Sequence, residues 1–363
     1  MTRSSVATLF ALAAAFAAAA PLTGCAAEPS EEDAAPAESS GDALTAKADE
    51  HWIYDGALPV LEGATITVSL KGHTARVSGY LPARATIPQL PHVRLTPEGA
   101  RTKIDIVYPI ATARPGKSNS QAGTYALQYV KPYRPDGAAW TQQEGEHMVP
   151  WGGFPFFAYN DGIAFHGPIT SMANPNPAQV DQSVWYLERG TVSGGCNRMM
   201  GEHVVELTHV VGVNMRRIYD PDRAVTPTNK APVNVIEDYD QWNGKYVDVD
   251  YPTSTGVTRP GKAFGVDKVE MFGSWVATEA PDGSDLPPDM KWEGGVSGKP
   301  YVFAQHAMPS VVCSFPKDTH ARLRELQRLR KGELPQDLCA KKTCFVDAIH
   351  AGRPTAQLEA ACR

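Results

Sequence analysis

The sequence predicts a mostly β protein with few helices and a small helical, cysteine-rich tail. Period-two alternation with many β-branched residues recurs through the first 250 residues, as half-buried strands require. The 31 Gly and 30 Pro favour turns over long helices. Helical patterns are confined to residues 200–211 and 318–331, and four of the six cysteines follow residue 312.

The expected elements follow one another along the chain. Residues 64–70 and 74–78 both alternate, and Lys71-Gly72-His73 between them predicts a hairpin turn. Further strands are expected at residues 93–95, 103–108, 124–130, 156–159 and 162–166, before the first helix. After that helix, strands are expected at residues 232–236, 245–250, 269–272 and 301–304, with a turn at Trp242-Asn243-Gly244.

The first 25 residues have the pattern of an export signal. Arg3 precedes an apolar, Ala-rich run at residues 6–20 that is short for a membrane span. Leu22-Thr23-Gly24-Cys25 then resembles a lipobox, the processing and lipidation site of bacterial lipoproteins. We expect an exported protein of the cell envelope, held by a lipid on Cys25 at the periplasmic face of an outer membrane. An ordinary signal peptide with a chance cysteine is the alternative.

Residues 26–50 predict a disordered acidic tether. Their Glu and Asp residues are separated mostly by Ala, Pro and Ser, so the segment cannot bury enough apolar surface to fold. Fully extended, it would span about 80 Å. The rest of the chain is long enough for one sizeable catalytic domain and a smaller appendage. The net charge of −6 gives no sign of nucleic-acid binding.

The cysteines divide into three expected roles. Cys25 would carry the lipid and Cys196 would be a free nucleophile. The remaining four form an even set in an exported chain, which predicts two disulfides among Cys313, Cys339, Cys344 and Cys362. Three pairings are possible, and Cys339–Cys344 with Cys313–Cys362 is the one we favour. A zinc site that uses these cysteines and His350 is the rival, but the spacing lacks a Cys-x-x-Cys knuckle.

The stretch Thr191-Val192-Ser193-Gly194-Gly195-Cys196-Asn197-Arg198 carries the strongest chemical signal. Cys196 follows two glycines and precedes the expected helix, whose N-terminus would stabilise a thiolate. The glycines let the backbone approach a substrate closely, so N–H groups at Gly194, Gly195 and Cys196 are candidate oxyanion donors. His166 is the candidate general base, and a thiol with a histidine is the minimum for acyl transfer through a thioester.

These residues resemble the L,D-transpeptidase family, the YkuD-type catalytic domain of bacterial cell-wall enzymes. The family carries His-Gly, a gap, and then Ser-His-Gly-Cys-x-Arg or Asn. His166-Gly167 matches the first pair, and Ser193, Gly195, Cys196 and Arg198 match the second motif. Gly194 stands where the family has a second histidine, and the stretch before Ser193 is longer than usual. The resemblance covers residues 81–251 and includes the 111–117 segment and Gly123-Thr124-Tyr125.

The resemblance implies a β-sandwich-like catalytic domain at residues 51–255, followed by an extension at 256–363. It implies a peptidoglycan stem peptide as donor, an amine acceptor, no cofactor and no metal, in a monomer. Ser193, Arg198 and Gly167 would contact substrate, and Arg198 suits a carboxylate. An L,D-carboxypeptidase or a wall-protein ligase is the alternative within the class. A non-catalytic peptidoglycan-binding lipoprotein is the alternative from another class.

Two further groups have structural explanations. His203, Glu206 and His209 do not have the His-Glu-x-x-His spacing of a zinc site, and the histidines are six residues apart. We expect no metal there. A set of aromatic residues before the expected 162–166 strand predicts core or groove wall, with a sugar-stacking surface as the alternative: Trp151, Phe154, Phe156 and Phe157.

Overall fold

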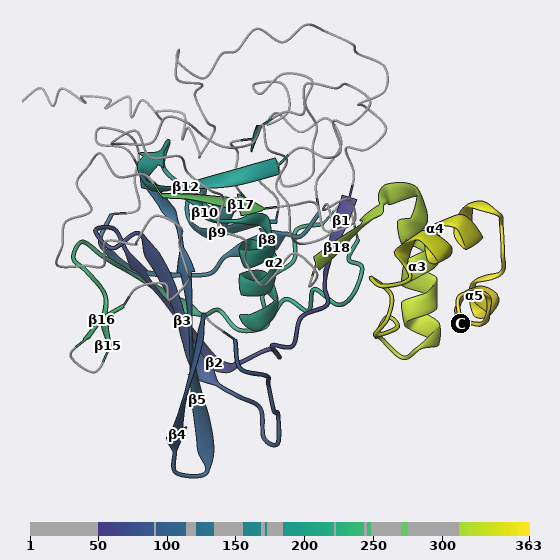
Figure 1. Ribbon diagram of the computed structural model, residues 1–363, viewed down its shortest axis with the longest axis horizontal. Coiled ribbons are helices and arrows are strands. Elements are labelled where there is room, and N and C mark those ends of the chain that lie inside the picture. Colours follow the sequence, from purple (N-terminus) through teal and green to yellow (C-terminus); the bar gives the residue numbers. More distant parts are fainter. Residues whose placement is uncertain are drawn as a thin grey trace, which may run out of the picture.

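Two β-sheets and one helix form the part of the fold that surrounds Cys196 (Figure 1). The computed structural model describes residues 50–90, 92–113, 121–133, 155–167, 171–172, 184–220, 223–242, 245–247, 270–274 and 312–363. Strands outnumber helices among these residues, which confirms the mostly β class. Most of the expected tether, the lipidation site Cys25, and the aromatic residues Trp151 and Phe154 lie outside the described residues.

The first sheet has six strands and contains the predicted hairpin. Its order is β4 (Val93–Glu98), β5 (Arg101–Pro109), β3 (Thr74–Tyr80), β2 (Glu62–Ser69), β14 (Pro232–Ile236) and β7 (Gly123–Ala126). β2 and β3 pair antiparallel, and every second residue of each is buried, as the alternation predicted. His73 lies in their connecting turn with a φ of 48°, a left-handed conformation that the tight reversal requires.

The second sheet has eight strands and contains Cys196 at one of its turns. Its order is β11 (Ser171–Met172), β12 (Val184–Ser193), β6 (Ala111–Ala113), β13 (Asn197–Arg198), β10 (Ile163–His166), β9 (Phe156–Asn160) and β8 (Tyr129–Lys131). β17 (Glu270–Ser274) pairs with the other edge of β12. A separate hairpin joins β15 (Gln241–Trp242) to β16 (Lys245–Tyr246).

The predicted strand at residues 124–130 is wrong as a single element. It divides into β7, which belongs to the first sheet, and β8, which belongs to the second. Leu127 and Gln128 form the connection, with Leu127 fully buried between the two sheets. One alternating run thus serves two layers, which periodicity alone does not reveal.

The main hydrophobic core fills the space between the two sheets and α2 (Gly201–Val210). Ile66, Val77 and Ile106 face it from the first sheet, and Phe157 and Phe165 face it from the second. Every residue of α2 is buried, so this helix is a central element and not a surface one. Its bounds agree with the predicted helix to within one residue at each end.

The C-terminal residues form a separate helical module beside this core (Figure 1). Its elements are β18 (Val312–Pro316), α3 (Lys317–Leu329), α4 (Lys342–His350), the 3₁₀ turn η4 (Thr355–Gln357) and α5 (Leu358–Ala361). β18 pairs antiparallel with β1 (Glu50–Tyr54). This pairing and the β12–β17 pairing cross the predicted boundary near residue 255, and the division into domains stays a prediction.

Both disulfides of the module are confirmed, but the favoured pairing is wrong. The bonds are Cys313–Cys339 and Cys344–Cys362, with Cα–Cα distances of 5.5 and 5.8 Å. α3 and its following turn return Cys339 to β18, while α5 brings Cys362 back to α4. Because all four sulfurs are bonded, the rival zinc site has no thiolates, and His350 instead contacts Asp318 at 2.9 Å.

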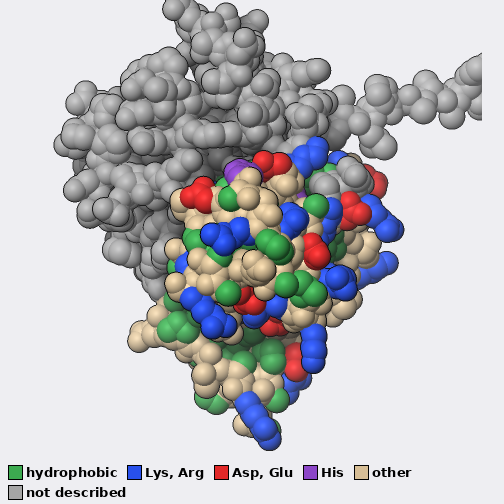
Figure 2. Space-filling view, turned by 90° about the vertical axis from the view of Figure 1, so that its right-hand side faces the viewer, with side chains coloured by type: hydrophobic (Ala, Val, Ile, Leu, Met, Phe, Trp, Pro, Cys, Tyr) green, Lys and Arg blue, Asp and Glu red, His purple; other side chains and the backbone are tan. Residues whose placement is uncertain are grey.

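The surface of this module is basic in composition but mixed in pattern. Residues 312–363 hold ten Lys and Arg against six Asp and Glu, whereas the whole chain has a net charge of −6. Figure 2 shows the face that carries the module, where positive and negative side chains alternate without a single-sign patch. Within the described part of the chain, no helix is both long enough and apolar enough to cross a membrane.

Candidate functional site

Cys196 lies in the tight turn between β12 and β13, beneath the surface. Its side chain is 1% exposed. The sulfur lies 3.3 Å from the backbone nitrogen of Ala164 on β10 and 3.6 Å from the carbonyl oxygen of Gly162. Asp161-Gly162 is the two-residue turn between β9 and β10, with φ angles of 36° and 97°. The sulfur thus sits against the start of the strand that ends in His166.

Cys196 and His166 lie on the same face of the second sheet. β10 and β13 are parallel neighbours, with Phe165 opposite Asn197 and His166 opposite Arg198. Phe165 belongs to the main core, whereas Cys196 and Ala164 belong to a separate cluster with Phe156 and Ala158. Because side chains alternate along a strand, Cys196, His166 and Arg198 share the face that points away from α2.

Hydrogen bonding and stacking fix the His166 ring. Its Nδ1–H donates to the carbonyl oxygen of Gly167 at 2.7 Å, which leaves Nε2 as the unprotonated nitrogen. The Phe156 ring stacks on it, with centroids 6.1 Å apart and planes inclined by 12°. The structure therefore gives Phe156 a place in the wall of the site, one of the roles expected from the sequence.

Burial controls the charge of His166. Desolvation, and next the positive charge of Arg198, lower its pKa to about 3, while the bond to Gly167 opposes the shift. The ring is consequently neutral at neutral pH, the protonation state that a general base needs. The same burial makes it a weaker base than a solvated imidazole.

The predicted oxyanion and substrate residues have distinct surroundings. Ser193 is buried, and its Oγ accepts the Gly195 N–H at 3.2 Å, so Ser193 shapes the turn. The Gly195 N–H is thereby occupied, which leaves the backbone N–H groups of Gly194 and Cys196 as the oxyanion candidates. Gly167 contributes the carbonyl that orients His166. Arg198 is half-buried beside that ring.

The expectation that Cys196 is a free thiol is wrong for this structure, in which Cys196 is disulfide-bonded. The four cysteines of the C-terminal module pair among themselves, so none of them is the partner of Cys196. A disulfide sulfur is no nucleophile, and acyl transfer at Cys196 requires this bond to be reduced or absent.

β13 lies between the cysteine and the helix. The Met199 N–H donates to the His166 carbonyl at 2.8 Å, and α2 begins only at Gly201. On the core side, Asn197 Nδ2 donates to the Tyr159 hydroxyl at 2.7 Å and ties β13 to β9. Sequence reasoning missed Tyr159 and Asn197. The Asp-Gly dipeptide of the neighbouring turn was the available signal for a tight hairpin here.

Glu206 anchors α2 to the neighbouring strands. Its carboxylate accepts hydrogen bonds from the Tyr54 hydroxyl at 2.7 Å, the Tyr108 hydroxyl at 3.0 Å and His92 Nε2 at 2.7 Å. His209 Nδ1 accepts the Met215 N–H at 3.2 Å. Across the described parts of the chain, no group of three or more His, Cys, Asp or Glu side chains is placed to hold a metal ion.

Comparisons with known proteins give distant matches only. No family model matches the chain. No curated protein matches it either. One similar solved structure is a fused Zn-dependent amidase/peptidase/peptidoglycan-binding domain-containing protein from Clostridium acetobutylicum, with 9% identity, a TM-score of 0.24, and coverage of 48% of this chain and 52% of that one. Another is Bd1075 of Bdellovibrio bacteriovorus, with 11% identity, a TM-score of 0.24, and coverage of 52% and 54%. The chain spans about half the length of the solved structures that it matches.

Proposed function

We propose that this protein is an L,D-transpeptidase of the bacterial cell wall, a cysteine acyltransferase that acts on peptidoglycan stem peptides. One observation carries the proposal. Cys196 and His166 share one face of adjacent parallel strands, and the His166 Nδ1 proton is committed to Gly167. A thiol and a neutral imidazole on the same face are what acyl transfer through a thioester requires.

The proposed reaction has two steps. His166 Nε2 takes the proton of the reduced Cys196 thiol, and the sulfur attacks the carbonyl at the L-centre of the third residue of a tetrapeptide stem. The proton passes to the leaving D-amino acid, and a thioester remains. An amine then attacks the thioester, which forms a new amide and returns the thiol. Backbone N–H groups at Gly194 and Cys196 would hold the oxyanion in both steps.

The acceptor defines the outcome of the second step. The diamino acid of another stem gives a 3-3 crosslink, and a free D-amino acid gives exchange. Water would make the protein an L,D-carboxypeptidase, and a protein lysine would make it a wall-protein ligase. All four acceptors use the same thioester, so the products distinguish them and the site residues do not.

A non-catalytic peptidoglycan-binding protein is the second candidate. Two observations favour it: the disulfide at Cys196, and the low pKa of His166, which weakens it as a base. Gly194 adds to these, because the histidine that the family has there is missing.

We place the enzyme in the cell envelope, exported and lipid-anchored through Cys25 at the periplasmic face of an outer membrane, as a monomer. The cysteine count links this anchor to activity. With four of the six cysteines paired in the module, a lipid on Cys25 leaves Cys196 without a cysteine partner in the same chain. The lipid-anchored form would therefore carry Cys196 as a thiol.

The test uses a soluble chain that begins after Cys25, in which Cys196 has no such partner. It is mixed with a disaccharide-tetrapeptide, and the products are read by mass spectrometry beside Cys196→Ala and His166→Gln. A 3-3 dimer made by the wild type alone supports the transpeptidase. Tripeptide alone moves the assignment to a carboxypeptidase. Binding without turnover in all three proteins would contradict the enzymatic proposal and support the non-catalytic peptidoglycan-binding protein.

A further inference from the structure

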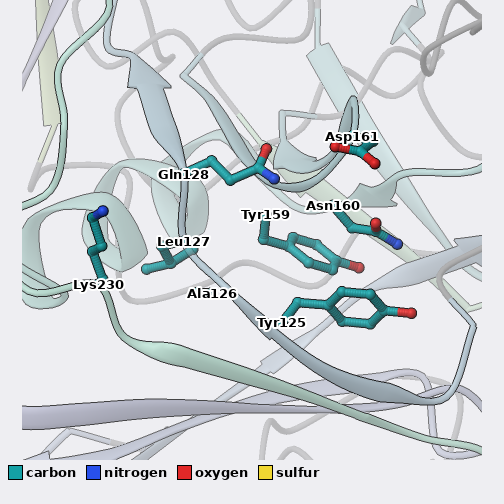
Figure 3. A pocket seen from close by; sticks show the side chains of 8 residues that line it. All are labelled: Tyr125, Ala126, Leu127, Gln128, Tyr159, Asn160, Asp161 and Lys230. Atoms are coloured by element: carbon teal, nitrogen blue, oxygen red, sulfur yellow. The ribbon is translucent and has the colours of Figure 1, made fainter.

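An open groove runs beside the turn that contacts the Cys196 sulfur. Its volume is about 460 Å³, within the range of small-molecule sites. Six of its lining residues supply an aromatic ring or a hydrogen-bonding group: Tyr125, Gln128, Tyr159, Asn160, Asp161 and Lys230 (Figure 3). They come from β7, from the connection between β7 and β8, from β9 with its turn, and from the residues before β14.

The groove shares the β9–β10 turn with the candidate nucleophile. Asn160 and Asp161 directly precede Gly162, whose carbonyl lies 3.6 Å from the Cys196 sulfur. On the other side of the strand, Tyr159 is bonded to Asn197, the residue that follows the cysteine. A molecule that fills the groove would therefore contact Asp161 of the β9–β10 turn, whose other residue, Gly162, contacts the Cys196 sulfur.

The lining combines an oriented aromatic ring with polar groups that solvent reaches. The half-exposed Tyr125 is held by its hydroxyl, which donates to the Gln121 carbonyl at 2.9 Å, and by a tilted contact with the Tyr159 ring at 5.8 Å. Figure 3 shows Lys230 at one end and Asp161 at the other, with Gln128 between them. The groove thus offers an aromatic ring, two amides, one carboxylate and one ammonium.

We propose that this groove binds a pyranose unit of the wall glycan; the proposal rests on the proposed function for its choice of polymer. A pyranose has an apolar C–H face that packs on an aromatic ring and a rim of hydroxyls that bond to amides and carboxylates. The alternative occupant is the stem peptide, since β7 is an edge strand of the first sheet. A stem peptide with several carboxylates would need a groove with excess positive charge. In this groove, the charges of Lys230 and Asp161 cancel one another.

The test measures sugar binding without acyl transfer. The full chain with Cys196→Ala is titrated calorimetrically with a soluble N-acetylglucosamine oligosaccharide that carries no peptide. We expect saturable binding that becomes roughly five- to tenfold weaker in Tyr125→Ala, the loss of one aromatic contact. Asp161→Asn should also weaken it, and this change suits the turn because Asn tolerates the positive φ. Tyr239→Ala, an equally half-exposed tyrosine elsewhere, should bind normally.

Each other result counts against the proposal. No binding, or an equal loss in Tyr239→Ala, removes the groove as a sugar site. A sugar-free stem peptide whose binding is lost in the Tyr125 and Asp161 variants makes it a peptide groove. If monomeric N-acetylglucosamine binds as tightly as the oligosaccharide, the groove recognises a free sugar and not a glycan chain. Acyl transfer by the wild type with no sugar binding overturns this inference alone, whereas sugar binding without acyl transfer overturns the proposed function alone.

Discussion

At the scale of single residues, the oxidation state of Cys196 decides whether this face of the sheet can react. The sulfur is buried and disulfide-bonded. We predict that unlipidated full-length chain does not react at Cys196 with iodoacetamide until it is reduced. After reduction, the Cys196 thiol should react with the reagent. Peptide mapping by mass spectrometry reads both; equal labelling of the unreduced wild type would contradict the prediction.

Gly194 offers a way to test the missing histidine directly. A Cβ at this position meets no atom within 4 Å, and Gly194 is not among the glycines with a positive φ. A side chain therefore fits there without backbone strain. We predict that Gly194→His, in the chain that begins after Cys25, raises the rate of thioester formation by roughly a hundredfold, the low end of what a positioned proton donor or acceptor supplies. Gly194→Ala is the control for the side chain alone, and an unchanged rate in Gly194→His would count against the family's two-histidine pattern here.

At the scale of elements, Glu206 fixes α2 behind the site. Three buried donors converge on its carboxylate from β1, β5 and the loop before β4. We predict that Glu206→Gln lowers the free energy of unfolding by roughly 2–4 kcal/mol, because an amide accepts through one oxygen only and its NH₂ faces a donor. Guanidine denaturation measures this, with the exposed Glu333→Gln as control. If Glu206→Gln lowers the free energy of unfolding by less than the control does, the hydrogen bonds to Glu206 are not needed for stability.

The strands and helices that could be predicted from the sequence are those determined by local residue patterns. β2, β3 and α2 were predictable, because one buried face or one continuous apolar stretch sets each of them. β12 was missed because it is a long strand with Arg189 inside; that side chain is buried only because it donates to the carbonyls of Gly72 and His73 at 2.8 and 3.1 Å. The disulfide pairing was missed for a similar reason, since α3 and α5 set which cysteines meet. In the candidate site, motif order predicted Cys196 and His166, whereas Tyr159, Asn197 and the disulfide depend on contacts between strands.

At the scale of the whole molecule, buried histidines make the fold sensitive to acid. Burial is the largest cause that lowers the pKa of His73 to about 4, of His166 and His209 to about 3, and of His51 well below its usual range. All four are neutral in the folded chain at neutral pH. Above about pH 6.5 these histidines are neutral in the unfolded chain as well. Their protonation therefore does not lower the free energy of unfolding at higher pH.

Stability should fall as pH drops below about 6.5, because the unfolded chain then takes up protons that the folded chain excludes. Each such histidine costs about 1.4 kcal/mol per pH unit down to its folded-state pKa. We predict a falling denaturation midpoint from pH 7 to pH 4, and a shallower fall in His209→Asn, whose amide oxygen can still accept the Met215 N–H. Urea denaturation across this range measures it. A midpoint that is flat from pH 7 to pH 5 would contradict the prediction.

The pairing of β1 with β18 has a mechanical consequence. The chain before residue 50 enters the described fold through β1, so a pull on that segment is felt first by this two-stranded ribbon. Ile53 lies opposite Cys313, and the Cys313–Cys339 disulfide ties the β18 strand of this ribbon covalently to the helical module. The eight-stranded sheet that carries Cys196 and His166 is a separate sheet from this ribbon. Tension on that segment would first strain the hydrogen bonds between β1 and β18, which lie outside the sheet that carries the reactive face.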